Sequence, residues 1–210
     1  IMEHYGAEVV CVHDEGDIGA CIEECIALAQ KMAAEDPRVF VPQQFVNRDN
    51  LAAHVDGTAA EILADVRAAG IAIDGFCSGF GTGGTITGIG SELRAVFPEV
   101  QIWAAEPEHA ALLSGGAIGT HVQMGIGDGI LPAIMDTSFI DGIVVVTDEE
   151  ALACARRLAR EEGLFCGISS GTNVAAALRL ARKLGPDKTV VTLAPDTGER
   201  YFSTVLFEGE

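Results

Sequence analysis

The sequence predicts an α/β protein in which an open, mostly parallel sheet is flanked by helices. An apolar strand candidate, residues 71–77, is followed by a glycine-rich turn and a helix candidate, residues 84–97. A second strand candidate, residues 100–105, comes directly after this helix, and this order is typical of two parallel strands joined by a helix. The composition agrees, because 49% of the 210 residues are hydrophobic and 25 are glycines suited to connecting loops.

The first part of the sequence predicts a helix end, a strand and a full helix. Residues 3–6 are typical of a last helical turn that stops at a glycine. Residues 7–12 form an apolar run that predicts a buried parallel strand. Residues 18–34 predict a helix, on whose apolar face Cys21 and Cys25 are expected to be small core residues.

The predicted strand at residues 7–12 bears on the domain organisation. A buried parallel strand needs neighbours on both sides, and the sequence does not supply all of them. We therefore expect residues 1–45 to be the remnant of an N-terminal domain and residues 46–210 to be a nearly complete C-terminal domain.

Residues 78–85, which read Ser-Gly-Phe-Gly-Thr-Gly-Gly-Thr, predict a phosphate-binding loop. Glycines allow a tight turn in which consecutive backbone N–H groups point into one concavity, and the N-terminus of the following helix favours an anion. The spacing Gly79, Gly81, Gly84 also fits a dinucleotide fingerprint, with Glu106 near the position of a ribose-binding acid. The hydroxyls of Thr82 and Thr85 favour one terminal phosphate over a diphosphate, but both alternatives remain open on these residues.

A second turn, residues 167–171, reads Gly-Ile-Ser-Ser-Gly and precedes a helix candidate at residues 172–184. In a parallel sheet both turns would lie at the carboxyl ends of strands, where open α/β folds place their ligands. The two turns therefore predict one composite site. Elsewhere, Thr147 and Glu150 form a capping-box pattern that predicts the start of a scaffold helix.

Several further motifs occur in a fixed order along the chain. They are Gln43-Gln44-Phe45, His54, residues 81–85, residues 125–129 with Leu131-Pro132, residues 161–171 and residues 198–204. Together these motifs strongly resemble the cysteine synthase (O-acetylserine sulfhydrylase) family, which has the tryptophan-synthase β-like, fold type II architecture and uses pyridoxal 5'-phosphate. The resemblance covers essentially the whole chain, which corresponds to the later two-thirds of a full-length member, so the N-terminal part is expected to be missing.

The resemblance implies a role for particular residues. It assigns Gly81, Thr82, Gly83, Gly84 and Thr85 to the cofactor phosphate. It assigns Ser169 to the pyridine nitrogen, where a neutral hydroxyl leaves the ring less electron-withdrawing than a carboxylate would and favours β-elimination and replacement. From the residues alone, a serine in this turn could instead cap the helix, and Ser170 is the better capping candidate.

The resemblance also covers the substrate side of the site. Gln44 matches a glutamine that faces the substrate, and His54 matches a histidine common at that spacing, although the family prolines between them are absent here. Gly127, with Gly125 and Gly129, matches a segment that lines the other face of the cofactor. Asp128 stands where family members often carry a small or an aromatic residue.

The Schiff-base lysine of the family is absent from this sequence, and so is the family's asparagine loop. The three lysines present, Lys31, Lys183 and Lys188, have no family motif around them. The sequence therefore shows no catalytic residue and predicts only half of an active site.

The resemblance implies pyridoxal-phosphate-dependent β-replacement that forms L-cysteine from O-acetylserine and sulfide. One alternative is phosphoserine as donor, or homocysteine as acceptor as in cystathionine β-synthase. A second alternative is a non-catalytic fragment that binds the cofactor or a partner. The family also suggests a homodimer and binding of the C-terminal tail of serine acetyltransferase.

Charge and cysteine content limit other partners. A formal net charge of −18 argues against nucleic-acid binding. We expect no membrane segment, no metal site and a cytoplasmic location, because no long apolar span, signal peptide or spaced set of metal ligands occurs. Cys77 and Cys166, beside the two turns, are expected at strand ends as buried reduced thiols.

Overall fold

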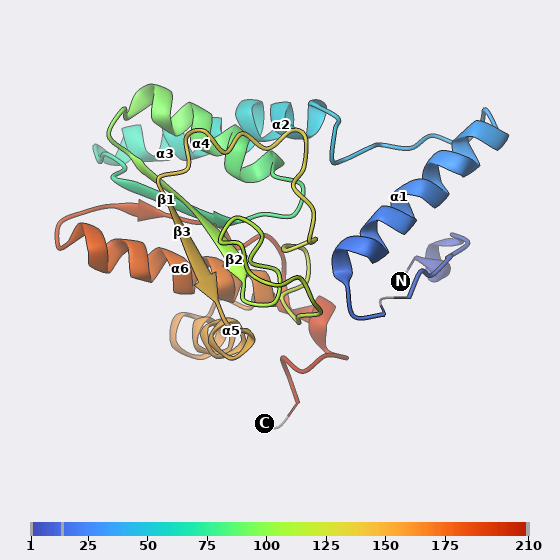
Figure 1. Cartoon of the computed structure of the whole chain (residues 1–210). Coiled ribbons are helices and arrows are strands. Elements are labelled where there is room, and N and C mark those ends of the chain that lie inside the picture. The colour runs from blue at the N-terminus through green and yellow to red at the C-terminus, as the bar shows by residue number, and fades with distance from the viewer. Residues whose placement is uncertain (1, 14, 209–210) are drawn as a thin grey trace.

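The computed structural model describes residues 2–13 and 15–208, and its centre is a parallel four-stranded sheet. The strand order is β3-β2-β1-β4. Figure 1 shows the sheet between two groups of helices. The strands are β1 (Gly75–Gly79), β2 (Gln101–Pro107), β3 (Gly142–Val146) and β4 (Val190–Val191). The prediction of an open parallel sheet is confirmed, although the first strand begins and ends later than residues 71–77.

Helices cover both faces of the sheet. One face carries α2 (Asp49–Ala53), α3 (Ala60–Ala69) and α4 (Gly84–Val96), and the other carries α5 (Asp148–Glu162) and α6 (Ile168–Leu184), as Figure 1 shows. Each face has its own hydrophobic core: Phe76, Ile89 and Ile102 belong to the first, and Val146 and Leu180 to the second. Residues of β1 are buried throughout, because this strand has neighbours on both edges and helices on both faces.

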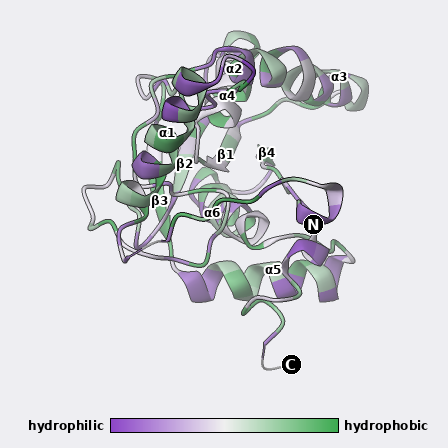
Figure 2. Ribbon diagram, turned by 90° about the vertical axis from the view of Figure 1, so that its right-hand side faces the viewer, coloured by the Kyte–Doolittle hydropathy of each residue, from purple (hydrophilic) through white to green (hydrophobic). Residues whose placement is uncertain are grey.

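Helix α5 begins as the sequence predicts. The Thr147 hydroxyl accepts the Glu150 N–H and the Glu150 carboxylate accepts the Thr147 N–H, both at 3.1 Å. Hydrophilic and hydrophobic residues alternate along this helix in Figure 2. Its buried residues, Ala151, Cys154 and Ala155, pack toward α6, so α5 is an amphipathic scaffold helix.

The N-terminal segment differs from the prediction. Residues 7–12 form no strand, and Val9 and Val10 are 41% and 61% exposed. The physical reason is that these residues meet no strand edge within the described chain, so their backbone has no sheet to join. Helix α1 (Ile18–Glu35) forms as expected but buries only Gly19, so Cys25 is exposed and Cys21 half-buried instead of lying in a core.

The second turn also differs from the prediction. It follows an isolated antiparallel bridge between Cys166 and Thr197, not a strand of the sheet. Helix α6 begins at Ile168 with Gly167 as its N-cap, so Ser170 is inside the first turn and does not cap the helix. Cys77, in the middle of β1, and Cys166 are both buried free thiols, which confirms their predicted burial.

Candidate functional site

A cavity of about 550 Å³ opens beyond the carboxyl ends of β1 and β4. The chain segments that leave these two neighbouring strands, residues 80–83 and 193–196, line it from different sides. This is the position at which open α/β sheets bind their ligands, and the volume is that of a typical small-molecule site.

Six of the eight sequence-predicted site residues line this one cavity. They are Gln44, Gly81, Thr82, Gly83, Thr85 and Ser169. The other two, Gly84 and Gly127, are not among the lining residues, although their chain neighbours are. The structure therefore brings the two predicted turns together into a composite site.

Close packing explains the glycines of the first turn. Gly83 has a φ of +78° and is the N-cap of α4, and a β-carbon there would lie 2.5 Å from Cβ of Met135. A β-carbon at Gly84 would lie 2.3 Å from Oδ1 of Asn50. A β-carbon would therefore clash with Met135 at position 83 and displace the Asn50 side chain at position 84, so glycine lets the start of α4 approach both residues closely.

Polar side chains from the α2 region hold the two threonines. Asn50 donates from Nδ2 to Thr82 Oγ1 at 2.9 Å and to the Gln44 carbonyl oxygen at 3.0 Å. His54 lies between two hydroxyls, with Nε2 3.1 Å from Thr85 Oγ1 and Nδ1 3.1 Å from Thr58 Oγ1. Burial lowers the pKa of His54, which favours the neutral imidazole.

His54 begins a π-helical stretch, His54–Ala59, that continues α2 into α3. A single wide turn of this kind inside a helix is frequent at functional sites. Gly88 of α4 packs against this stretch, where a β-carbon would lie 2.8 Å from Cβ of His54. This close packing positions the His54 side chain next to Thr85.

The first turns of α6 form another part of the cavity wall. Ser169 is 3% exposed, lines the cavity, and makes no hydrogen bond through its hydroxyl to the described residues. One turn later, Asn173 accepts the Gly79 N–H at 2.7 Å and donates to the Leu193 carbonyl oxygen at 3.0 Å. These bonds hold the ends of β1 and of the loop after β4 against α6.

Asp196, in the segment that follows β4, also lines the cavity. Its Oδ2 accepts the Tyr201 hydroxyl at 2.6 Å, and its other oxygen, Oδ1, is buried without a hydrogen-bond partner among the described residues. Burial and this acidic partner together raise the pKa of Tyr201. A buried acceptor without a donor is uncommon, and here it stands in the wall of a ligand-sized cavity.

The segment after β2 forms the third side of the site. Gly127 has a φ of +70°, donates its N–H to the Phe80 carbonyl oxygen at 2.9 Å, and accepts from His121 Nε2 at 2.9 Å. Its neighbours Gly125, Ile126 and Asp128 line the cavity. The predicted role of Gly127 as a lining residue is therefore taken by these neighbours.

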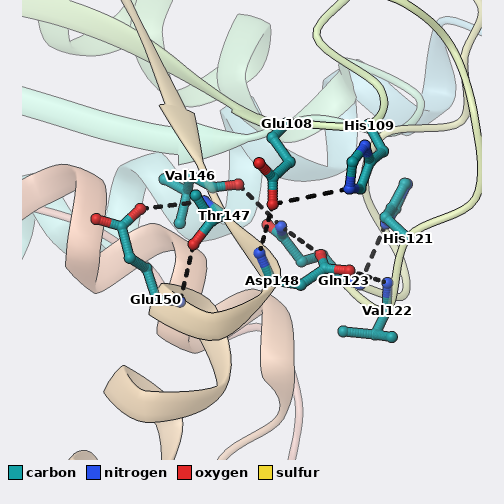
Figure 3. Close-up of polar contacts among 9 residues, drawn as sticks. All are labelled: Glu108, His109, His121, Val122, Gln123, Val146, Thr147, Asp148 and Glu150. Atoms are coloured by element: carbon teal, nitrogen blue, oxygen red, sulfur yellow. Dashed lines mark hydrogen bonds and ion pairs between the residues drawn. The ribbon is translucent and has the colours of Figure 1, made fainter.

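A buried polar network fixes the start of this segment, as Figure 3 shows. The fully buried Gln123 donates from Nε2 to the Val146 carbonyl oxygen at 3.0 Å and to Asp148 Oδ1 at 2.9 Å. Its Oε1 accepts the Thr172 hydroxyl at 2.8 Å. The network connects the glycine-rich segment to the ends of β3, α5 and α6.

Asp128 lies at the phosphate-loop end of the cavity. A β-carbon at Gly81 would lie 2.8 Å from its Oδ2. Burial raises the pKa of Asp128, and the nearby His121 opposes this shift. Asp128 and Gln44 also line a second, more apolar cavity beside α1.

The lysines lie outside the cavity. Lys31 is on the surface of α1 within 3.9 Å of Glu35, and Lys188 contacts Asp74 at 2.7 Å. Lys183 lies 4.4 Å above the ring of Trp103. The described residues that line the cavity include no lysine and no arginine, so its donors to an anion are neutral groups.

The structure removes the ribose-binding residue on which the dinucleotide alternative depends. Glu106 is fully buried, and its carboxylate accepts the Leu113 N–H at 2.5 Å, the Ser114 N–H at 3.1 Å and the Ser114 hydroxyl at 2.8 Å. These three donors belong to the chain itself, so this carboxylate is not free to bind a ribose.

The comparisons with known proteins agree with a site that combines a phosphate-binding loop and a serine. The family of pyridoxal-phosphate dependent enzymes matches residues 1–196. The chain belongs to this family. A probable cysteine synthase of Bacillus subtilis is 40% identical over 207 residues, covering 99% of this chain and 65% of that protein. A cysteine synthase of Staphylococcus aureus is likewise 40% identical and is covered to 64%.

Solved structures show the same fold type II architecture. A cysteine synthase of Entamoeba histolytica superposes with a TM-score of 0.84 at 36% identity, covering 100% of this chain and 60% of that one. An O-acetylserine dependent cystathionine β-synthase of Helicobacter pylori gives 0.81 at 35% identity, with 87% and 58% covered. The chain therefore spans slightly less than two-thirds of the length of the curated relatives it matches.

The residues of the cavity fit pyridoxal 5'-phosphate, the cofactor of this family. The glycine turn and the start of α4 offer N–H groups to a phosphate, and Ser169 offers a hydroxyl to a ring nitrogen. Within residues 2–13 and 15–208 no cluster of three potential metal ligands is present, and no helix is long and apolar enough to cross a bilayer.

Sequence reasoning did not single out Asn50, Gln123, Asn173 or Asp196. Asn50, Gln123 and Asn173 act through partners far along the chain, such as Gly79 for Asn173, which is 94 residues away. The side-chain partner of Asp196 is Tyr201, five residues away. One local signal was available for three of them: Gln123, Asn173 and Asp196 each stand within two residues of a glycine, where polar side chains often bind turn backbone.

Proposed function

We propose that this chain forms the cofactor-holding part of an enzyme that makes L-cysteine from O-acetylserine and sulfide by β-replacement. One observation carries the proposal: Gly81, Thr82, Gly83 and Thr85 of the first turn line the same cavity as Ser169 of the second. The kinship with cysteine synthases supports the choice of reaction. When bound, pyridoxal 5'-phosphate supplies the electron-withdrawing ring, and the chain holds its phosphate and its nitrogen in place.

The residues that carry out this holding are those of the two turns. The N–H groups at the start of α4 and the hydroxyls of Thr82 and Thr85 bind the phosphate, while Ser169 meets the ring nitrogen. Gln44 lines both this cavity and the second one, and we assign it to the substrate side of the site. In this proposal residues 46–210 are the cofactor-binding domain and residues 1–45 belong to a second domain.

The absence of a lysine from the cavity favours a second candidate for the isolated chain. All three lysines of the sequence lie elsewhere in the structure, so the 210-residue chain is expected to bind the cofactor without a covalent bond. Turnover then requires a lysine from polypeptide outside this sequence. The donor and acceptor proposed here are O-acetylserine and sulfide, with the cystathionine β-synthase reaction as the alternative.

A binding and trapping experiment tests this function. The chain is titrated with pyridoxal 5'-phosphate and with pyridoxine 5'-phosphate, which has no aldehyde, and is then reduced with borohydride and analysed by mass spectrometry. We expect similar affinities for the two compounds and no cofactor attached to Lys31, Lys183 or Lys188. Failure of both to bind contradicts the proposal, and cysteine formation by the isolated chain contradicts the requirement for an external lysine.

The remaining family expectations are proposals of the same kind. We propose a homodimer in the cytoplasm whose cleft accepts the C-terminal tail of serine acetyltransferase. Light scattering with and without a peptide of that tail measures the oligomeric state and the binding of the peptide. A monomer contradicts the proposed homodimer, and a chain that does not bind the peptide contradicts the proposed partner.

A further inference from the structure

Thr82 and Thr85 of the phosphate-binding loop both line the cavity, and each has a nitrogen-bearing side chain within hydrogen-bond distance of its hydroxyl. The described residues that line the cavity include no lysine and no arginine, so an anion bound there takes its hydrogen bonds from neutral donors. A threonine hydroxyl has one proton and two lone pairs. It can therefore donate to an anion only if the protein leaves that proton unused.

Asn50 settles the direction of the hydrogen bond at Thr82. One end of this amide lies 3.0 Å from the Gln44 carbonyl oxygen, which can only accept, so that end is the nitrogen Nδ2. The same Nδ2 donates to Thr82 Oγ1 at 2.9 Å, and the Gly84 N–H reaches this oxygen at 3.4 Å. Thr82 thus accepts from the protein, and no described residue uses its own proton.

His54 allows two arrangements at Thr85. Its Nε2 lies 3.1 Å from Thr85 Oγ1 and its Nδ1 lies 3.1 Å from Thr58 Oγ1, and neither hydroxyl makes another hydrogen bond to the described residues. Burial lowers the pKa of His54, so at about pH 7 the ring has one N–H donor and one acceptor nitrogen. Either Thr58 donates to Nδ1 and Nε2–H donates to Thr85, or both bonds run the other way. In the second arrangement Thr85 offers the cavity only lone pairs, which repel an anion.

We propose that Thr58 donates its hydroxyl proton to Nδ1 of His54, so that Nε2–H donates to Thr85 and Thr85 donates to the phosphate of the bound ligand. Thr85 then has the same arrangement as Thr82, in which a nitrogen donates to the hydroxyl oxygen and the hydroxyl proton is left for the ligand. His54 and Thr58 are positioning residues, because in this arrangement they act on the ligand through Thr85. The inference deepens the proposed function and rests on it, since it concerns the phosphate of the same cofactor.

The local helix brings the two positioning residues together. His54 and Thr58 are four residues apart in the π-helical stretch, and side chains at this spacing meet on one face of a helix. Close packing with α4 holds the histidine in place, because a β-carbon at Gly88 would lie 2.8 Å from Cβ of His54. No sequence motif described above includes Thr58, so its role follows from its contact with His54.

Nuclear magnetic resonance of the imidazole nitrogens reads the arrangement directly, because protonated and unprotonated ring nitrogens resonate at well separated frequencies. The 210-residue chain is labelled at its histidine nitrogens and studied at about pH 8, where the neutral ring predominates. The signals of His54 are identified by their loss in His54→Gln. The probes are pyridoxine 5'-phosphate and inorganic phosphate, neither of which needs a lysine. We expect the proton of His54 on Nε2 in both complexes, and a proton on Nδ1 instead overturns the proposal.

Substitutions at Thr58 separate positioning from a purely structural role. Thr58→Val removes the donor to Nδ1, so both tautomers of His54 should be populated and the affinity for pyridoxine 5'-phosphate should fall about three- to tenfold, the effect of one hydrogen bond. Thr58→Ser keeps the hydroxyl and should restore both the tautomer and the affinity. Thr137→Val, at an exposed threonine outside the cavity lining, is the matched control and should change neither. A purely structural role would lower the urea midpoint of Thr58→Val without moving the His54 signals.

The outcomes separate this inference from the proposed function. If the chain binds inorganic phosphate with the His54 proton on Nε2 but does not bind pyridoxine 5'-phosphate, the cofactor function fails and the arrangement around His54 stands as that of a phosphate site. If the chain binds pyridoxine 5'-phosphate and Thr58→Val matches it in tautomer and affinity, the function stands and the role of Thr58 is overturned. If neither compound binds, both proposals are contradicted.

Discussion

Asn173 on α6 accepts the backbone N–H of Gly79, the last residue of β1, at 2.7 Å. The same amide donates to the Leu193 carbonyl oxygen at 3.0 Å, so one side chain joins a strand, a helix and the loop after β4. Asn173 itself is 1% exposed and lines the cavity. One amide group therefore ties the end of β1 and the loop after β4 to α6 at the wall of the cavity.

Replacing Asn173 by alanine should destabilise the protein by at least about 2 kcal/mol, because it leaves a buried N–H and a buried carbonyl oxygen without partners. Urea unfolding followed by circular dichroism measures this loss. Leu178→Ala, on an exposed position of the same helix, is the matched control for shortening a side chain on α6. Equal losses for the two variants would show that the amide contributes nothing specific.

Replacing Gly84 by alanine should displace Asn50, whose Oδ1 occupies the space of the new β-carbon. Asn50 holds Thr82 and the Gln44 carbonyl, so the phosphate loop should lose its shape. We expect the affinity for pyridoxine 5'-phosphate to fall about tenfold or more, the effect of one strong hydrogen bond.

The control for this change is Gly57→Ala in the π-helical stretch. A β-carbon at Gly57 meets no described atom within 4 Å, and alanine is the better helix former. Affinity should therefore stay the same and stability should rise slightly. A loss of affinity in Gly57→Ala as large as in Gly84→Ala would argue that helix composition, not the contact with Asn50, controls the loop.

The buried imidazole of His54 predicts a stability that depends on pH. Its pKa in the folded protein is lowered from 6.5, so the unfolded chain binds a proton more readily there than the folded chain does. The contribution of His54 to the free energy of unfolding is therefore full above pH 6.5, and it decreases as the pH falls below this value. Urea midpoints measured between about pH 7 and about pH 5 should fall less steeply for His54→Gln. Parallel curves for the two proteins would contradict a role of His54 in this decrease.

The capping box at the start of α5 gives a local test. Thr147→Ala removes the acceptor of the Glu150 N–H and should cost about 1 kcal/mol of stability. Thr147→Ser keeps the hydroxyl and should lose much less. Thermal unfolding of the two variants decides the point, since equal losses would assign the effect to the threonine methyl group.

The sequence predicted those features whose causes are local. Helix α4 ends within one residue of the predicted 84–97, and the capping box at Thr147 is formed as expected, because glycine and capping patterns act over a few residues. The predicted strand at residues 7–12 is wrong, since a strand depends on partners that a local pattern does not reveal. Strand β4, only two residues long, gives no periodic signal at all.

The candidate site likewise combines features that the sequence predicted with features that depend on distant parts of the chain. The two turns were predicted from their glycines and hydroxyls, and the structure brings both onto one cavity. The second turn nevertheless follows a single bridge at Cys166 instead of a strand. Asn173 and Asp196 were not foreseen, because their importance comes from which backbone groups they meet after folding.

The burial of Cys77 has a practical consequence. This thiol lies in the centre of β1, and burial raises its pKa to about 12, so the reactive thiolate is essentially absent while the strand stays in the sheet. Cys11 and Cys25, by contrast, are exposed. The rate at which an alkylating reagent modifies Cys77 therefore reports how often the central sheet opens. This natural cysteine can serve as a probe of sheet opening without any added label.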